Sequence, residues 1–242
     1  SDSFALPLGE MFTLKNYTET FDKFQIGSAY RNSIIISGAV TILVVLIAGL
    51  AAYGMARYSF RGRKFLQALL VASMMFPVFA TIIPVFSMQV KWGIVNTSVP
   101  LSWLSVILPQ TAGNIAFGTI VLQGFIRSLP VDLEEAAYLE GYGVFRIFFR
   151  IIMPLAKPSF ATIAIFSFLW SYNDLFTQMF YQRRADYFTI TRLMNDISSQ
   201  SGGTHYGWMA AAVVVVVVPV LIVYVLLQKN IVKGLTAGAV KG

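Results

Sequence analysis

Five long stretches with almost no charged side chain decide what this chain can fold into. Each holds about 20 or more mostly apolar residues, the length that a helix needs to cross the hydrocarbon core of a bilayer. The stretches cover residues 32–56, 65–90, 101–126, 159–182 and 208–228, and their only charged residue is Asp174. A segment in lipid must satisfy its own backbone hydrogen bonds, which a helix does by itself. The sequence therefore predicts an all-α, polytopic membrane helix bundle with five spans.

The composition points to the same solvent. Charged residues make up 12% of the chain, whereas a soluble domain carries about 25%. So few charges cannot cover a surface exposed to water. Cysteine is absent from the sequence, which excludes disulfides, a thiol nucleophile and thiolate metal sites.

Basic residues collect on one side of the predicted membrane. The loops after the first, third and fifth stretches hold Arg57, Arg61, Arg63, Lys64, Arg127, Arg146, Arg150, Lys157, Lys229, Lys233 and Lys241. Basic and acidic residues balance on the other side, so the formal charge of +7 lies on this one. The positive-inside rule assigns it to the cytoplasm. Residues 1–31 are then an extracytoplasmic segment, residues 32–232 the membrane domain and residues 233–242 a cytoplasmic tail. Because membrane side explains the positive charge, we expect no nucleic-acid partner.

The cytoplasmic segment 130–158 is too patterned to be a simple connector. Asp132 is placed to cap a helix, and Glu135 three residues later completes a capping-box-like pair. Gly141 and Gly143 break this helix, and a second short helix, both apolar and basic, ends at Pro154. The resulting helix–turn–helix is either a docking element for a cytoplasmic partner or an amphipathic element lying on acidic lipid.

The same segment resembles the EAA loop of permeases from ATP-driven (ABC-type) importers. That pattern is Glu-Ala-Ala, three residues, Gly, nine residues, Ile, one residue, Leu-Pro. Its positions here are Glu135, Ala136, Ala137, Gly141, Ile151, Met153 and Pro154. Met153 replaces the usual Leu, a mild change in volume. Glu140 stands where many sugar-type members have Asp, which keeps the charge.

Further motifs resemble the second permease subunit of maltose-type carbohydrate importers. They are Asn16-Tyr17, Asn32-Ser33, Ala51-Ala52-Tyr53 with Arg57, Phe60 to Arg63, Trp170 to Asp174, and the tail Gly234 to Gly242. Members of this family have six helices. The five stretches place the first residue outside the cell, so we expect that a preceding helix is missing from this sequence; a true five-span protein is the alternative.

The resemblance implies a bacterial inner-membrane subunit that translocates a sugar. Its partners would be a second permease subunit, two ATP-binding subunits, an extracytoplasmic solute-binding protein and the lipid bilayer. The chain holds no Gly-x-x-x-x-Gly-Lys-Ser/Thr motif, so it cannot cradle ATP phosphates itself. We therefore expect no catalytic residue, no metal site and no cofactor bound by this chain, with ATP and Mg²⁺ held by the partner subunits.

The resemblance also assigns roles within residues 130–158, the coupling segment. Glu135 would pair with a basic residue of the ATPase, or cap its helix, or do both. The remaining candidates are Ala136 and Ala137 for close approach, Gly141 for the turn, Phe145 and Phe148 for filling a groove on the partner, and Pro154. For the two aromatic residues the alternative is contact with the bilayer or with the chain's own helices. In the tail, Thr236 and Lys241 would reach the ATP-binding subunits.

Polar residues inside the spans indicate a substrate path. The candidates are Gln110, Asn114, Trp170, Tyr172, Asn173 and Asp174, which combine aromatic rings with amides and a carboxylate as sugar sites do; helix packing is the alternative for each. Asp174 is predicted at the centre of the fourth span. Pro77 and Pro84, seven residues apart, could bow the second span around a cavity.

Three other functions compete with a sugar importer. An ABC permease for another solute would share the EAA loop. An intramembrane serine protease would need a histidine base within the membrane, but His205, the only histidine, lies in an external loop. An ion-coupled secondary transporter would need paired ionisable residues in its spans, and Asp174 alone is a thin basis for that.

Overall fold

The computed structural model describes residues 14–95, 97–200 and 206–239. Its helices are α1 (Lys15–Lys23), α2 (Ile26–Arg57), α3 (Arg63–Met74), α4 (Val78–Lys91), α5 (Val99–Ser128), α6 (Asp132–Leu139), α7 (Val144–Ile147), the π-helical turn η2 (Phe148–Ile152), α8 (Met153–Leu155), α9 (Lys157–Asn173), α10 (Phe176–Tyr181), the 3-10 turn η3 (Ala185–Tyr187), α11 (Ile190–Gln200) and α12 (Tyr206–Ala239). These described residues contain no strand, which confirms the all-α part of the prediction.

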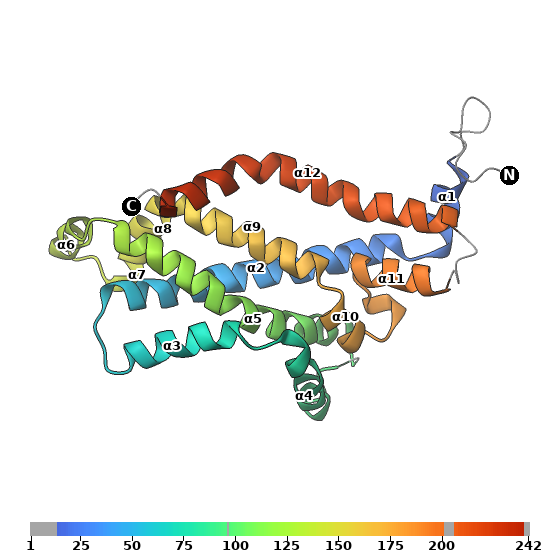
Figure 1. The fold of residues 1–242 in the computed structure, drawn as a ribbon, viewed down its shortest axis with the longest axis horizontal. Coiled ribbons are helices and arrows are strands. Elements are labelled where there is room, and N and C mark those ends of the chain that lie inside the picture. Colours follow the sequence, from blue (N-terminus) through green and yellow to red (C-terminus); the bar gives the residue numbers. More distant parts are fainter. Residues whose placement is uncertain (1–13, 96, 201–205, 240–242) are drawn as a thin grey trace.

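Helix α2 is the centre of the bundle. It packs along α5 and α9, and α12 covers α9 (Figure 1). A row of fully buried side chains follows one face of α2 at every fourth position, namely Ile36, Val40, Val44, Ala48 and Ala52. Residues four apart lie above one another on a helix, so this row forms a continuous apolar ridge. Gly118 of α5 faces the ridge so closely that an added Cβ would lie 3.0 Å from the Cβ of Ala48.

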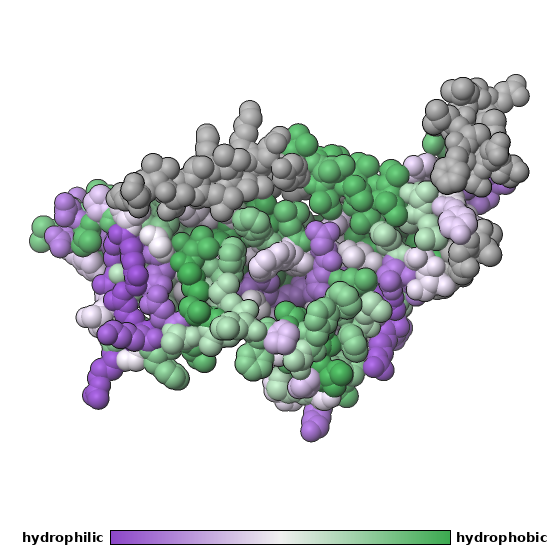
Figure 2. Space-filling model, in the orientation of Figure 1, coloured by the Kyte–Doolittle hydropathy of each residue, from purple (hydrophilic) through white to green (hydrophobic). Residues whose placement is uncertain are grey.

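Two helices of the described part, α2 and α5, are each long and apolar enough to cross a membrane. Two bent pairs, α3 with α4 and the Val144–Leu155 segment with α9, would raise the number to four if each pair were one span. The stretch 208–228 lies within α12. Hydrophobic residues cover much of the visible face, and hydrophilic residues gather toward its two ends and also show in its middle (Figure 2).

The second predicted span is not one helix. Helices α3 and α4 meet at an angle of 101°, and Pro77 lies at the break with extended backbone. Proline removes a backbone donor and also disfavours helix in the residue before it, so the helix stops there. Pro84, by contrast, lies inside α4. The expectation that both prolines bow a single helix is wrong.

The fourth predicted span also breaks. Helix α9 ends at Asn173, and Asp174 has extended backbone before α10 begins at Phe176. Asp174 is thus at a break, and its predicted place at a helix centre is wrong. The Asp174 Oδ1 accepts the backbone N–H of Thr177 at 3.1 Å. Aspartate side chains compete with helical hydrogen bonds in this way, which explains the interruption.

Helix α2 begins at Ile26, six residues before the predicted start of the first span at residue 32. The pair Asn32-Ser33 has a structural role there. Asn32 Nδ2 donates to the carbonyl of Phe188 at 3.0 Å, and Ser33 Oγ accepts the N–H of Ile190 at 2.8 Å. The start of α2 therefore holds the segment that leads into α11.

Candidate functional site

The coupling segment, residues 130–158, lies at the end of the bundle where α2 and α5 end (Figure 1). Its first helix, α6, follows α5 closely. The N-cap position is Val131, and no side chain caps the helix. Asp132 is an exposed residue of the first turn, so the predicted capping box with Glu135 is wrong. The acids of this turn still lie at the positive end of the helix dipole, where negative charge is stabilising.

The turn after α6 requires glycine. The N–H of Gly141 donates to the carbonyl of Tyr138 at 3.0 Å, and the N–H of Tyr142 donates to that of Ala137 at 2.9 Å. These two bonds define a Schellman motif, in which the residue after the C-cap adopts left-handed backbone. Gly141 has φ of 81°. The predicted turn at this glycine therefore has a defined geometry that other residues adopt with strain.

We expect Gly141→Ala to destabilise the chain by about 1–2 kcal/mol, the cost of left-handed backbone for an L-residue. Gly143 provides the control, because its φ is −78° and no atom lies within 4 Å of an added Cβ. Heat-induced unfolding of both variants in detergent measures the difference. Equal unfolding midpoints for the two variants would contradict the assignment of strain to Gly141.

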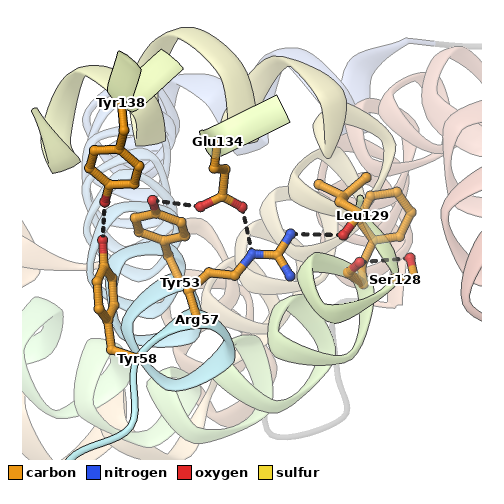
Figure 3. Close-up of polar contacts among 8 residues, drawn as sticks. Tyr53, Arg57, Tyr58, Ser128, Leu129, Glu134 and Tyr138 are labelled. Carbon is orange, nitrogen blue, oxygen red and sulfur yellow. Dashed lines mark hydrogen bonds and ion pairs between the residues drawn. The ribbon is translucent and has the colours of Figure 1, made fainter. Parts of the chain in front are cut away.

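A buried ion pair attaches α6 to α2 (Figure 3). Arg57 Nε lies 2.5 Å from Glu134 Oε1, and the two side chains are 9% and 5% exposed. Tyr53 donates its hydroxyl to the other carboxylate oxygen of Glu134 at 2.9 Å. Tyr53 and Arg57 are four residues apart on α2, so they present one face to the acid. We refer to Tyr53, Arg57 and Glu134, with the tyrosine pair described next, as the α2–α6 clamp.

Two more hydrogen bonds extend this contact. Arg57 Nη2 donates to the carbonyl of Leu129, which follows α5, at 2.9 Å. The hydroxyls of Tyr58 and Tyr138 lie 2.6 Å apart (Figure 3). The hydrogen bond with Tyr58 raises the pKa of the Tyr138 phenol. The clamp thus joins the adjacent ends of α2 and α5 to α6.

Phe148 was predicted to fill a groove on the partner or to contact the chain's own helices, and the structure shows the second. Its side chain is fully buried within this chain. The centroid of its ring lies 5.6 Å from that of the Tyr53 ring and 6.1 Å from that of the Phe160 ring. The space exists because Gly49 of α2 lacks a side chain: an added Cβ would lie 3.2 Å from the Phe148 ring and 2.6 Å from that of Phe160. Phe148 is therefore an internal anchor of the coupling segment.

The other predicted docking residues divide between core and surface. Ala137 is 5% exposed and packs in the apolar core, so it is not available for close approach by a partner. Glu135 and Ala136 are exposed. Phe145 is 68% exposed and Leu139 is 91% exposed. The outer face of the segment thus combines acids with large apolar side chains.

Pro154 is exposed but does not end the second helix. The chain stays helical through Leu155 and turns by 85° into α9 at Ala156. The π-helical turn η2 ends at Ile152, two residues before Pro154. Such turns relocate backbone hydrogen bonds, which accommodates the bond that proline cannot make.

Path candidates from the third and fourth predicted spans meet at the break after α9. Gln110 Nε2 donates to Asp174 Oδ2 at 2.8 Å, and Ser171 Oγ donates to Gln110 Oε1 at 2.6 Å. Asp174 is half-buried, and Asn173 beside it is exposed. This arrangement gives the only acid of the predicted spans two fixed donors and one open side.

The other path candidates occupy different surroundings. Trp170 is 52% exposed and packs against Phe117, and Asn114 is half-buried with its Nδ2 bonded to the Gln110 carbonyl at 2.7 Å. Tyr172 is 4% exposed and stacks on Phe168 in an apolar cluster with α2 and α11, which favours the alternative of helix packing for this residue. Thr236 lies in the helical part of α12, but its side chain, like Lys241 and His205, falls outside the described residues.

Sequence reasoning missed the partners of Glu134. A signal was available, since Tyr53 and Arg57 stand four residues apart at the end of a predicted span and the acid next to Glu135 had no assigned role. Nothing in the sequence pairs these residues, because Arg57 and Glu134 are 77 positions apart.

Comparison with known proteins places the chain in a family. Residues 44–237 match the family described as the binding-protein-dependent transport system inner membrane component, and the chain belongs to that family. It is 35% identical to the diacetylchitobiose uptake system permease protein NgcG of Streptomyces coelicolor over 98% of this chain and 77% of that one. It is 33% identical to the melibiose/raffinose/stachyose import permease protein MelC of Bacillus subtilis over 94% of this chain and 80% of that one.

Solved structures share the fold. A chain of a bacterial ABC transporter involved in the import of the acidic polysaccharide alginate superposes with a TM-score of 0.75 and 22% identity, over 92% of this chain and 81% of that one. A chain of the methionine ABC transporter MetNI superposes with a TM-score of 0.63 and 12% identity, over 86% and 95%. The described helices therefore have the arrangement of ABC importer membrane subunits.

Proposed function

We propose that this chain is the membrane permease subunit of an ATP-driven importer, and that it translocates a sugar delivered by an extracytoplasmic solute-binding protein. The observation that carries the proposal is the coupling segment. In this chain, which belongs to the family named above, a buried ion pair and Phe148 attach the segment to the core. Its outer face remains exposed. A partner that binds this face can move the bundle.

The exposed face has the chemistry of a protein interface. Glu135 offers a carboxylate to a basic residue, while Leu139 and Phe145 expose apolar surface beside it. Large exposed apolar side chains near charged ones are typical of sites where another protein binds. The partner in this proposal is an ATP-binding subunit that holds ATP and Mg²⁺; two such subunits and a second permease would complete the transporter. The coupling segment and the C-terminal tail would then face the cytoplasm.

The proposed substrate is a sugar because several of the relatives carry the names of sugar permeases. They include the two permeases above and the trehalose transport system permease protein SugB of Mycobacterium tuberculosis. In this chain, Asp174 and Asn173 would accept and donate hydrogen bonds to hydroxyl groups, with Trp170 supplying an apolar face. Gln110 and Asn114 would line the same path.

Co-purification tests the docking proposal. The chain is co-expressed with its neighbouring candidate subunits, and recovery of an ATP-binding subunit in detergent is compared with that of a Glu135→Arg, Phe145→Asp variant. We expect the variant to insert normally and to lose the subunit, because it reverses the charge and places a carboxylate in the apolar contact. Asp22→Arg is the control, since it makes a similar charge reversal at an exposed site on α1, at the opposite end of the bundle.

Uptake in proteoliposomes then separates the rival mechanisms. We expect labelled-sugar uptake that needs both internal ATP and the solute-binding protein, and no response to an imposed proton or sodium gradient. Uptake driven by an ion gradient alone would contradict the proposal and would favour a secondary transporter that uses Asp174. If wild type retains no ATP-binding subunit, or the docking variant retains it fully, the proposed interface is wrong.

A further inference from the structure

The α2–α6 clamp is built from two matched helix faces. Tyr53 and Arg57 are four residues apart on α2, and Glu134 and Tyr138 are four residues apart on α6. Each pair therefore projects from one side of its helix. The acid meets Tyr53 and Arg57, and one turn further along α6 Tyr138 meets Tyr58 (Figure 3). Two contacts at separate points fix the orientation of a short helix, whereas one contact would allow it to pivot.

Burial makes the clamp hard to open. The side chains of Arg57 and Glu134 are 9% and 5% exposed. Separating them leaves two uncompensated charges in an apolar setting, which is strongly unfavourable. The same guanidinium also holds the Leu129 carbonyl at 2.9 Å. A rotation of α6 away from α2 would therefore break the contacts of Glu134 with both Tyr53 and Arg57, while Arg57 would keep α2 joined to the end of α5.

The clamp delivers any movement of α6 to the centre of the bundle. Helix α2 packs along α5 and α9 through its buried ridge. Phe148 provides a second, apolar attachment of the segment. Its ring packs on Gly49 of α2 and against Phe160 of α9. Close-packed contacts of this kind transmit displacement with little deformation.

We propose that the clamp stays closed throughout the transport cycle, so that α6 and the adjoining ends of α2 and α5 move as one rigid unit. This inference rests on the proposed function. Arg57 and Glu134 are then positioning residues: they touch neither ATP nor sugar, and they carry the movement of the ATP-binding subunit to the spanning helices. The opposite mechanism is a hinge at α6 that opens and closes in each cycle.

A chemical cross-link distinguishes a rigid unit from a hinge. The chain contains no cysteine, so Tyr58→Cys with Tyr138→Cys introduces one unique pair at two exposed positions. The hydroxyls of the two tyrosines meet end to end (Figure 3). A bifunctional thiol reagent that spans two tyrosine rings therefore replaces their contact. The variant is assembled with the second permease, the ATP-binding subunits and the solute-binding protein in proteoliposomes.

We expect the cross-link to form equally well without nucleotide and with trapped ATP, and the cross-linked complex to keep its ATP-driven uptake. Single-cysteine variants treated with the reagent give the reference activity. A cross-link that forms in only one nucleotide state, that never forms, or that lowers uptake about tenfold relative to that reference would overturn the proposal. Wild type, measured in parallel, separates the two hypotheses: if it shows no ATP-driven uptake, the proposed function fails before the clamp is tested.

The coupling ratio provides a second readout that folding alone would not change. We expect Glu134→Gln to keep the hydrogen bond from Tyr53 and to lose the charge pair, so that sugar uptake per ATP hydrolysed falls about tenfold while ATP hydrolysis continues. Asp132→Asn is the matched control, because it neutralises an exposed acid on the same helix. A coupling ratio equal to wild type in Glu134→Gln would contradict a positioning role.

Discussion

Glu134→Ala is expected to destabilise the chain by about 3–5 kcal/mol, because it leaves the Arg57 guanidinium buried without its counter-charge. The loss should exceed that of an ordinary hydrogen bond, which contributes about 0.5–1.5 kcal/mol. Arg57 is 9% exposed and keeps only the Leu129 carbonyl as an acceptor in this variant. Denaturation of the purified chain by titration from mild detergent into sodium dodecyl sulfate measures the change.

A double-mutant cycle separates the pair from its surroundings. Replacing both partners by apolar residues, Arg57→Met with Glu134→Leu, should cost less than either single replacement, because no buried charge is left unpaired. Asp132→Ala is the control on the same helix, and as an exposed substitution it should change stability by at most about 0.5 kcal/mol. If Glu134→Ala is no more destabilising than Asp132→Ala, the ion pair does not hold α6 in place.

The sequence predicted the class of fold because hydrophobic content is a local property. Each apolar stretch can be read without knowing its neighbours, and the helices occupy those stretches. The positions at which a helix bends cannot be predicted from hydrophobic content in the same way. Replacing a straight helix by two helices at 101° leaves the apolar count of residues 65–90 unchanged. Pro77 and Asp174 were both visible in the sequence, but hydropathy gives no weight to the breaks that they cause.

The coupling segment shows a second limit. Glu134 and Glu135 are adjacent and chemically alike, yet one is buried and the other exposed. Successive residues on a helix point about 100° apart, so one of two neighbouring acids can face inward while the other faces a partner. Which of them does so depends on Arg57, far away in the sequence. The pattern could therefore locate the segment and its turn, but could not divide its side chains between core and surface.

Phe148→Ala should destabilise the chain by about 3–5 kcal/mol, whereas Phe145→Ala should leave its stability almost unchanged. The two residues have the same chemistry and lie three positions apart, but Phe148 is fully buried and Phe145 is 68% exposed. Truncating Phe148 opens a cavity between Tyr53, Gly49 and Phe160, whose backbone and rings can close it only in part. Truncating Phe145 removes a ring that is mostly exposed in this chain and therefore opens no cavity.

The order of the two effects should reverse when recovery of the ATP-binding subunit is measured in place of stability. Phe145→Ala should lower its recovery in co-purification while the unfolding midpoint in detergent stays at the wild-type value. Phe148→Met, which restores most of the buried volume with a flexible side chain, should regain much of the stability lost in Phe148→Ala. If Phe145→Ala is the more destabilising of the two, or if only Phe148→Ala affects recovery of the subunit from a folded chain, the assignment of one ring to the core and the other to the partner is wrong. The pair thus tests, across the adjoining turns α7 and η2, whether attachment to α2 and contact with the ATPase are separate properties of the coupling segment.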